Sequence, residues 1–283
     1  MQEYNGFHRK LQNYCLGGHP EMVLEMLKEG MDKYPKHLSE MLFEGIMACI
    51  ELDQHESALT MMKLADSQGF WYPTEMFPEE KGYELYTKKW HENRGRVSQA
   101  SMQVGYENGL NMLALHGWGE DLSLFRRYFH SDGFEKRGRI HYLQSSQKIG
   151  DIQYVWNDRK QAEHDVRHYL TETLGDMKID ILAGFSQGGY LALDFLVHEI
   201  IDVDKLILIC PGKEDYTLKA LTSLAKNGVE VLLISGTQDF DHEYHNNLYE
   251  RLREADVRVD YQVIEKMGHW FPEDLDKRID SFI

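Results

Sequence analysis

The stretch that decides the fold runs from residue 179 to residue 188 and reads Ile179-Asp180-Ile181-Leu182-Ala183-Gly184-Phe185-Ser186-Gln187-Gly188. Residues 179–183 have the apolar character of a strand, and a helix follows with Leu191, Phe195 and Leu196 on one face. Between them, the pattern Gly-x-Ser-x-Gly in a strand-turn-helix context is typical of a nucleophilic serine on a strained turn. The alternative is a glycine-rich loop with a structural serine. We expect Ser186 to project over the edge of a sheet.

From about residue 99 onward, short apolar runs alternate with longer amphipathic stretches, which is the pattern of an α/β domain. Asn108-Gly109 suits a hairpin turn between the first two strands, because Asn-Gly tolerates positive φ angles. The expected strands lie near 100–106 and at Asn111–Leu115, Ile140–Leu143, Ile179–Ala183, Leu206–Cys210, Val231–Ser235 and Tyr261–Ile264. The alternation predicts a mostly parallel sheet with helices on both faces and with chemistry at the carboxyl ends of its strands.

Residues 1–98 read instead as helices and contain a weak internal repeat. The segment Gly18–Val23 has a counterpart at Gln54–Leu59, with His19 and His55 separated by 55 − 19 = 36 residues. This offset is close to the length of about 34 residues of a tetratricopeptide unit, to which the helix pairs bear a loose resemblance. Pro20 suits a first helical position and Gly69 a position just past a helix end. Methionine-rich stripes on these helices are either core filling, which we favour, or an adaptable binding surface.

Composition excludes several classes of function. The 283 residues include 31 Lys and Arg against 47 Asp and Glu, which gives a formal net charge of −16. This balance argues against a general nucleic-acid binder and against docking on an anionic membrane. No apolar run approaches the roughly 20 residues of a membrane-spanning helix, and the polar first residues do not resemble a signal peptide. The odd, scattered cysteines Cys15, Cys49 and Cys210 fit a reducing cytoplasm.

A serine nucleophile needs a base, and two segments supply a candidate base and the acid that orients it. Asp239 follows the strand Val231–Ser235, and His269 follows the strand Tyr261–Ile264, so both lie on the same sheet edge as Ser186. We assign Asp239 to orient the imidazole and His269 to act as general base and then general acid. Asp241 is a rival for the acid, but the Gly-x-x-Asp turn favours Asp239.

The neighbouring cluster of Asp239, Asp241, His242 and His245 suggests a metal site as an alternative, since acid and histidine side chains ligate zinc or iron. We favour the simpler interpretation, in which His242 and His245 lie on the polar face of the next helix. The sequence therefore predicts neither a metal nor any other cofactor.

Acyl transfer also needs donors for a developing oxyanion. One is expected to be the backbone N–H of Gln187, and the other that of Trp118, in a loop that follows an early strand. His116 and Gly117 of the same loop are candidate substrate-binding residues. Trp156, in the loop 144–158, is either a substrate wall or a packed anchor of a surface loop.

Together, Leu115-His116-Gly117 and the string GFSQGG at 184–189 resemble the phospholipase/carboxylesterase family of α/β-hydrolases, which includes acyl-protein thioesterases. The resemblance covers roughly residues 100–283. It implies a cofactor-free serine hydrolase of carboxylic and thio esters, with Ser186, Asp239 and His269 as the triad and Trp118 and Gln187 as oxyanion donors.

The chain departs from that family at three points. Tyr190 stands where a small residue is usual, residues 239–242 lack the valine-proline that often follows the acid, and the helical segment ahead of the first strand is unusual. Depalmitoylation is therefore not carried over.

The sequence thus predicts an α/β-hydrolase domain at 99–283 behind a helical segment at 1–98. We expect a cytoplasmic serine esterase or thioesterase that acts on small or medium acyl groups. Two alternatives stay open. One is an interaction or dimerisation protein that uses its N-terminal helices and carries an idle hydrolase scaffold, and the other is a serine peptidase.

Overall fold

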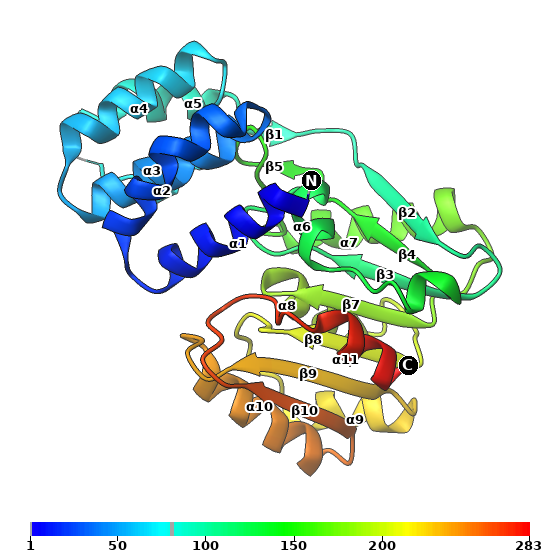
Figure 1. Cartoon of the computed structure of the whole chain (residues 1–283). Coiled ribbons are helices and arrows are strands. Elements are labelled where there is room, and N and C mark those ends of the chain that lie inside the picture. The colour runs from blue at the N-terminus through cyan, green and yellow to red at the C-terminus, as the bar shows by residue number, and fades with distance from the viewer. Residues whose placement is uncertain (1, 80–81) are drawn as a thin grey trace. The chain divides into compact units, whose positions relative to one another are not determined.

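The computed structural model describes residues 2–79 and 82–283, and the chain divides into two compact units (Figure 1). One unit comprises the residues up to Gly95 together with Lys148–Gln153. The other comprises Arg96–Gln147 and Tyr154–Ile283. The short strands β1 (Gly95–Arg96), β5 (Gln147–Lys148) and β6 (Tyr154–Val155) lie at or next to the points where the chain passes from one unit to the other.

The first unit is helical, as expected. Its helices are α1 (Gln2–Leu16), α2 (Pro20–Lys33), α3 (Leu38–Glu51), α4 (His55–Ser67) and α5 (Glu84–Glu92). Pro20 occupies the first turn of α2, where its missing N–H costs no hydrogen bond, and Gly69 follows α4 with a φ of +80°. The predicted start of a helix at Pro20 and the predicted end of a helix before Gly69 are therefore both confirmed.

The core of this unit explains the methionine stripes. Met62 is fully buried and Val23 and Leu27 are nearly so, whereas Met22 is exposed. Helices α1 and α2 pack closely at Gly30, where an added Cβ would lie 2.4 Å from the ring of Phe7. These positions therefore serve mainly as core, and the resemblance to tetratricopeptide repeats stays a prediction.

The second unit is built on a seven-stranded sheet, in the order β10-β9-β8-β7-β3-β4-β2 (Figure 1). Only β2 runs antiparallel to its neighbour. The strands are β2 (Ser101–Gly105), β3 (Leu110–Leu115), β4 (Gly138–Leu143), β7 (Ile181–Phe185), β8 (Lys205–Ile209), β9 (Glu230–Gly236) and β10 (Arg258–Ile264). The mostly parallel sheet predicted from the alternating pattern is confirmed.

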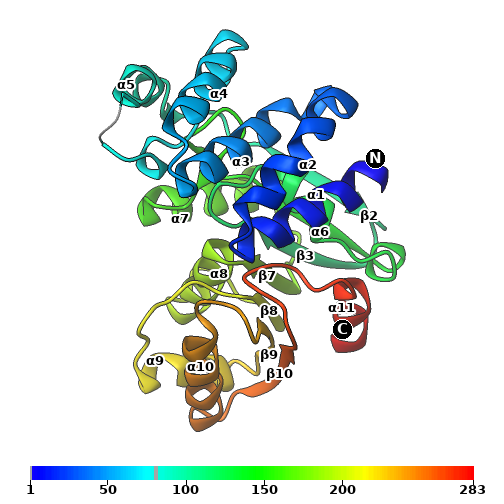
Figure 2. The ribbon, with the colours of Figure 1, turned by 60° about the vertical axis from the view of Figure 1, so that its left-hand side comes forward.

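Helices cover both faces of the sheet, and a hydrophobic core lies under each set. One face packs on α7 (Arg159–His168), α8 (Gln187–Val197), α9 (Leu218–Lys226) and α10 (His242–Glu254). The other packs on α6 (Leu122–Tyr128) and α11 (Leu275–Phe282). Figure 2 shows α8 to α10 on one side of the sheet and α11 on the other. The strands β3, β7 and β8 are buried on both faces, which is why they read as continuous apolar runs.

The expected hairpin at Asn108-Gly109 is wrong. Strand β2 pairs with β4 rather than with β3, because β4 lies between them and is parallel to β3. Gly109 does not adopt a positive φ. It is required for another reason, since an added Cβ would lie 1.8 Å from the carbonyl oxygen of Arg137. The turn does link β2 to β3 along the chain, but both strands pair with β4 instead of with each other.

Among the described residues, no helix has both the length and the apolar character that crossing a membrane requires.

Candidate active site

The turn between β7 and α8 holds Ser186 in a strained conformation. Its φ of +50° and ψ of −117° lie in a region that non-glycine residues rarely adopt. Two backbone hydrogen bonds, to the last residue of β8 and to the segment after it, hold it there: Ser186 N to Ile209 O and Gly212 N to Ser186 O, each 2.9 Å long. The flanking glycines are required by contact, because a Cβ on Gly184 would lie 2.2 Å from the carbonyl oxygen of Gly188.

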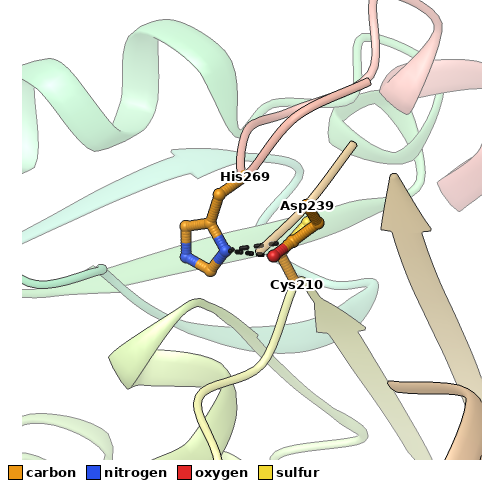
Figure 3. Close-up of side chains that lie close together, drawn as sticks. All are labelled: Cys210, Asp239 and His269. Atoms are coloured by element: carbon orange, nitrogen blue, oxygen red, sulfur yellow. Dashed lines mark hydrogen bonds and ion pairs between the residues drawn. The ribbon is translucent and has the colours of Figure 1, made fainter. Parts of the chain in front are cut away.

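Three side chains predicted from separate segments meet at this edge of the sheet. His269 Nε2 lies 2.8 Å from Ser186 Oγ, and His269 Nδ1 lies 2.9 Å and 3.0 Å from the two carboxylate oxygens of Asp239. The dashed lines of Figure 3 mark the contacts with Asp239. Because a carboxylate only accepts, Nδ1 carries the proton, which leaves Nε2 free to accept the hydroxyl proton of Ser186. This geometry is that of a nucleophile, a base and an orienting acid.

The acid is buried but charged. Burial alone would raise the pKa of Asp239, but the hydrogen bond and charge of His269 lower it to about 2. The backbone N–H of Asp241 also donates to Asp239 Oδ1, at 2.8 Å. The rival acid, Asp241, instead pairs with Lys213, at 2.5 Å between Nζ and Oδ1. The structure therefore brings Asp239, and not Asp241, to the imidazole.

A thiol completes the surroundings of the acid. Cys210, Asp239 and His269 offer potential ligand atoms within 4.8 Å of one another (Figure 3). Burial, and next the charge of Asp239, raise the pKa of the Cys210 thiol well above its usual range, so the sulfur keeps its proton. The thiol donates to the carbonyl oxygen of Trp270, at 3.7 Å, and His269 Nδ1 is already engaged by the carboxylate. This trio fits a buried hydrogen-bonding group better than a metal centre.

The two histidines of the metal alternative both bond to the hydroxyl of Ser235. Ser235 Oγ lies 2.8 Å from His245 Nδ1 and 3.1 Å from His242 Nδ1. His245 Nε2 donates to the carbonyl oxygen of Pro211, at 2.9 Å. The placement of His245 on a polar helix face is wrong, because the side chain is fully buried against Ser235 and Pro211. It braces the segment that follows β8 and so helps to hold the serine turn.

The loop after β3 leaves one backbone donor unused. Gly117 N donates to Glu120 Oε2 at 2.6 Å, and Gly119 N donates to Tyr154 O at 2.9 Å. Within the part of the chain that the structure describes, Trp118 N, between them, has no hydrogen-bond acceptor. The backbone N–H of Gln187, the first residue of α8, has none there either.

The start of α8 lies against this loop. A Cβ on Gly188 would lie 2.2 Å from Leu115 O and 2.4 Å from His116 O. The side chain of Gln187 joins the loop that follows β6, accepting from Trp156 N and donating to Asn157 Oδ1, both at 2.8 Å. The two unused backbone donors therefore belong to segments in direct contact, and one of them, Gln187, directly follows Ser186.

His116, Gly117 and Trp156 are buried, which argues against the expectation that they bind substrate. His116 is fully buried, and burial lowers its pKa to about 4, so its ring is neutral. The ring donates from Nδ1 to Gly117 O, at 2.7 Å, and accepts from Ser145 N at Nε2, at 3.1 Å. Trp156 is 2% exposed, and its Nε1 donates to His116 O at 3.0 Å. All three residues hold the loop that carries Trp118. For Trp156, the structure therefore favours the packed anchor of a loop over a substrate wall.

Glu120 is a residue that the sequence reasoning missed. Its carboxyl group is buried behind Gly117, and its second oxygen, Oε1, has no hydrogen-bond partner within the described residues. Burial raises its pKa to about 8, against the smaller opposing effect of the hydrogen bond from Gly117. A glutamate directly after a Trp-Gly pair gives no sequence signal for burial, because only the tertiary packing removes it from water.

This burial predicts a pH-dependent stability. A carboxyl group whose folded-state pKa is raised contributes stability that is fully present below its unfolded-state pKa, near 4.3, and is lost as the pH rises through about 8. Glu120→Gln removes that titration. Denaturant unfolding of both proteins at pH 5 and pH 9 is expected to show the variant gaining free energy of unfolding relative to the wild type at pH 9. An equal difference between the two proteins at both pH values would contradict the buried, protonated carboxyl.

Comparisons with known proteins agree with this architecture. No protein-family model matches the chain, and no curated protein matches it. Among solved structures, an uncharacterized protein from Bacillus cereus ATCC 10987 is similar at a TM-score of 0.56 and 19% identity, over 98% of this chain and 96% of that one. The carboxylesterase CesB (YbfK) from Bacillus subtilis is similar at 0.51 and 14% identity, over 71% of this chain and 98% of its own.

The naproxen esterase (carboxylesterase NP) from Bacillus subtilis gives a TM-score of 0.52 at 13% identity, over 72% of this chain and 99% of that one. At such identities the likeness concerns the fold. The sheet order, the helices on both faces and these neighbours together define the α/β-hydrolase fold.

Proposed function

We propose that the chain is a serine hydrolase that cleaves carboxylic esters or thioesters through an acyl-enzyme on Ser186. The observation that carries the proposal is the unbroken line of hydrogen bonds from Ser186 Oγ through His269 to Asp239. The strained serine turn and the two unused backbone N–H groups beside it support the same reaction. In this proposal the second unit is the catalytic domain.

In the first half-reaction, His269 Nε2 takes the hydroxyl proton as Ser186 Oγ attacks the carbonyl carbon. The carbonyl oxygen becomes an anion, and the N–H groups of Trp118 and Gln187 are assigned to stabilise it. The bond to the leaving oxygen or sulfur then breaks, and His269 gives it the proton. An acyl-enzyme and a free alcohol or thiol result.

In the second half-reaction, His269 takes a proton from water, which attacks the acyl-enzyme. Collapse of the second tetrahedral intermediate returns the proton to Ser186 and releases the acid. Asp239 keeps its negative charge throughout and stabilises the imidazolium that forms twice in the cycle. No cofactor takes part in either step.

Covalent labelling tests the proposal. We expect a fluorophosphonate to modify the native protein at one residue, identified as Ser186 by peptide mass spectrometry, and not to modify the heat-denatured protein. p-Nitrophenyl esters of increasing chain length should give turnover, whereas a p-nitroanilide peptide should not, which separates an esterase from a peptidase. A native protein that neither labels nor hydrolyses any ester would end the proposal and leave the idle-scaffold alternative.

Two further expectations are part of the proposal. The cysteines Cys15, Cys49 and Cys210 are free, which fits the reducing conditions of a cytoplasm. The N-terminal helices are proposed to bind a partner protein or a second copy of the chain.

A further inference from the structure

An exposed aromatic ring lies on the imidazole of His269. Phe240, the residue after the acid, is 74% exposed, yet its ring stacks on His269 with centroids 4.4 Å apart and planes inclined by 24°. Phe185, which is buried, also contacts the imidazole, with centroids 5.4 Å apart. A large apolar side chain left in water at the reacting group presents a free surface where an apolar part of a substrate can bind.

The proposed chemistry fixes which part of the substrate meets this ring. The carbonyl oxygen faces the N–H groups of Trp118 and Gln187. The leaving oxygen or sulfur must lie at His269 Nε2, because that nitrogen delivers its proton. A group that covers His269 therefore contacts the alcohol or thiol part of the substrate rather than the acyl part.

The charged residue that follows Phe240 in the chain is already paired. Asp241, next in the chain, lies 2.5 Å from Lys213, so neither residue offers an uncompensated charge to a leaving group. An aromatic group matches the exposed ring best. Two aromatic rings in an offset or edge-to-face arrangement gain interaction energy in addition to the energy gained by burying their apolar surface.

We propose that Phe240 is a substrate-contact residue that selects esters whose leaving group carries an aromatic ring close to the scissile bond. This inference rests on the proposed function and adds to it the class of alcohol. Phe240 acts in formation of the acyl-enzyme and not in its hydrolysis, because the alcohol has left before water attacks.

The test compares esters that share one acyl group. Benzyl and ethyl butyrate form the same acyl-enzyme, and their alcohols have similar acidities, so the ratio of their kcat/KM values reports alcohol binding in the transition state. Phe240→Ala is expected to lower the benzyl-to-ethyl ratio roughly three- to tenfold. Phe240→Tyr, which keeps the ring, should retain the ratio. Tyr106→Ala removes another exposed aromatic, in the turn at the opposite edge of the sheet, and should leave the ratio unchanged.

A second series holds the alcohol constant. Ethyl acetate, butyrate and octanoate are expected to keep their relative kcat/KM values in Phe240→Ala. By microscopic reversibility, benzyl alcohol should also be a better acyl acceptor than ethanol for the wild type, and this preference should weaken in the variant.

The outcomes separate the two proposals. A wild type that hydrolyses esters while Phe240→Ala leaves the benzyl-to-ethyl ratio unchanged overturns the role of Phe240 and keeps the serine hydrolase. An equal loss of kcat/KM on all esters also overturns the role in substrate selection and keeps the serine hydrolase. In that case Phe240 would only hold the ring of His269 in place. A wild type inactive on every ester overturns both.

Discussion

Ser186→Ala is expected to lower kcat for ester hydrolysis by about 10⁵- to 10⁶-fold and to abolish fluorophosphonate labelling. The reason is that, within the described residues, Ser186 Oγ is the hydroxyl that bonds to His269 Nε2, at 2.8 Å, and the strained turn holds it there. Single-turnover measurements with an activated ester give the loss of hydrolysis. Intact-protein mass spectrometry after fluorophosphonate treatment gives the loss of labelling.

A matched serine variant controls for that result. Ser223→Ala removes a half-buried hydroxyl from α9 that donates to Ala220 O and is not bonded to any residue of the site, so kcat and labelling should stay within about twofold of the wild type. Near-full turnover by Ser186→Ala would exclude the acyl-enzyme mechanism.

Asp239→Asn is expected to lower kcat by about 10⁴-fold with little change in KM. The asparagine amide can donate to His269 Nδ1, which would then become the acceptor and place the proton on Nε2. In that tautomer the imidazole cannot accept the hydroxyl proton of Ser186. Because the pKa of Asp239 is about 2, the wild-type carboxylate stays charged above pH 4, so loss of activity between pH 4 and pH 7 arises from another group.

Asp241→Asn is the control for the acid, and it also tests the rival assignment. Asp241 pairs with Lys213 and is not bonded to His269 through its side chain, so kcat is expected to fall by less than about tenfold. A larger loss in Asp241→Asn than in Asp239→Asn would assign the acid to Asp241.

Much of the fold could be predicted because its signals are local. Apolar runs predicted the parallel strands, and Gly184 and Gly188 marked the turn whose close contacts require glycine. Three candidate site residues each follow a strand, in the chain order Ser186, Asp239, His269. The structure places these same residues within hydrogen-bond distance of one another. Parallel strands align their carboxyl ends, so the position of a residue after its strand already limits where it lies.

Other features depend on contacts between distant segments. The turn at Gly109 predicted a hairpin, but the insertion of β4 between β2 and β3 decided the pairing. His116 and Trp156 looked like pocket residues, but the packing of the loop after β3 against α8 buried them.

By itself, then, the sequence determined the strands, the serine turn and the identity of the candidate triad, because strand periodicity and turn chemistry act over a few residues. Only the tertiary structure decided which polar groups are buried, as for Glu120, and which apolar ones stay exposed, as for Phe240. Burial depends on every segment that packs around a side chain, and most of those segments are remote in the sequence.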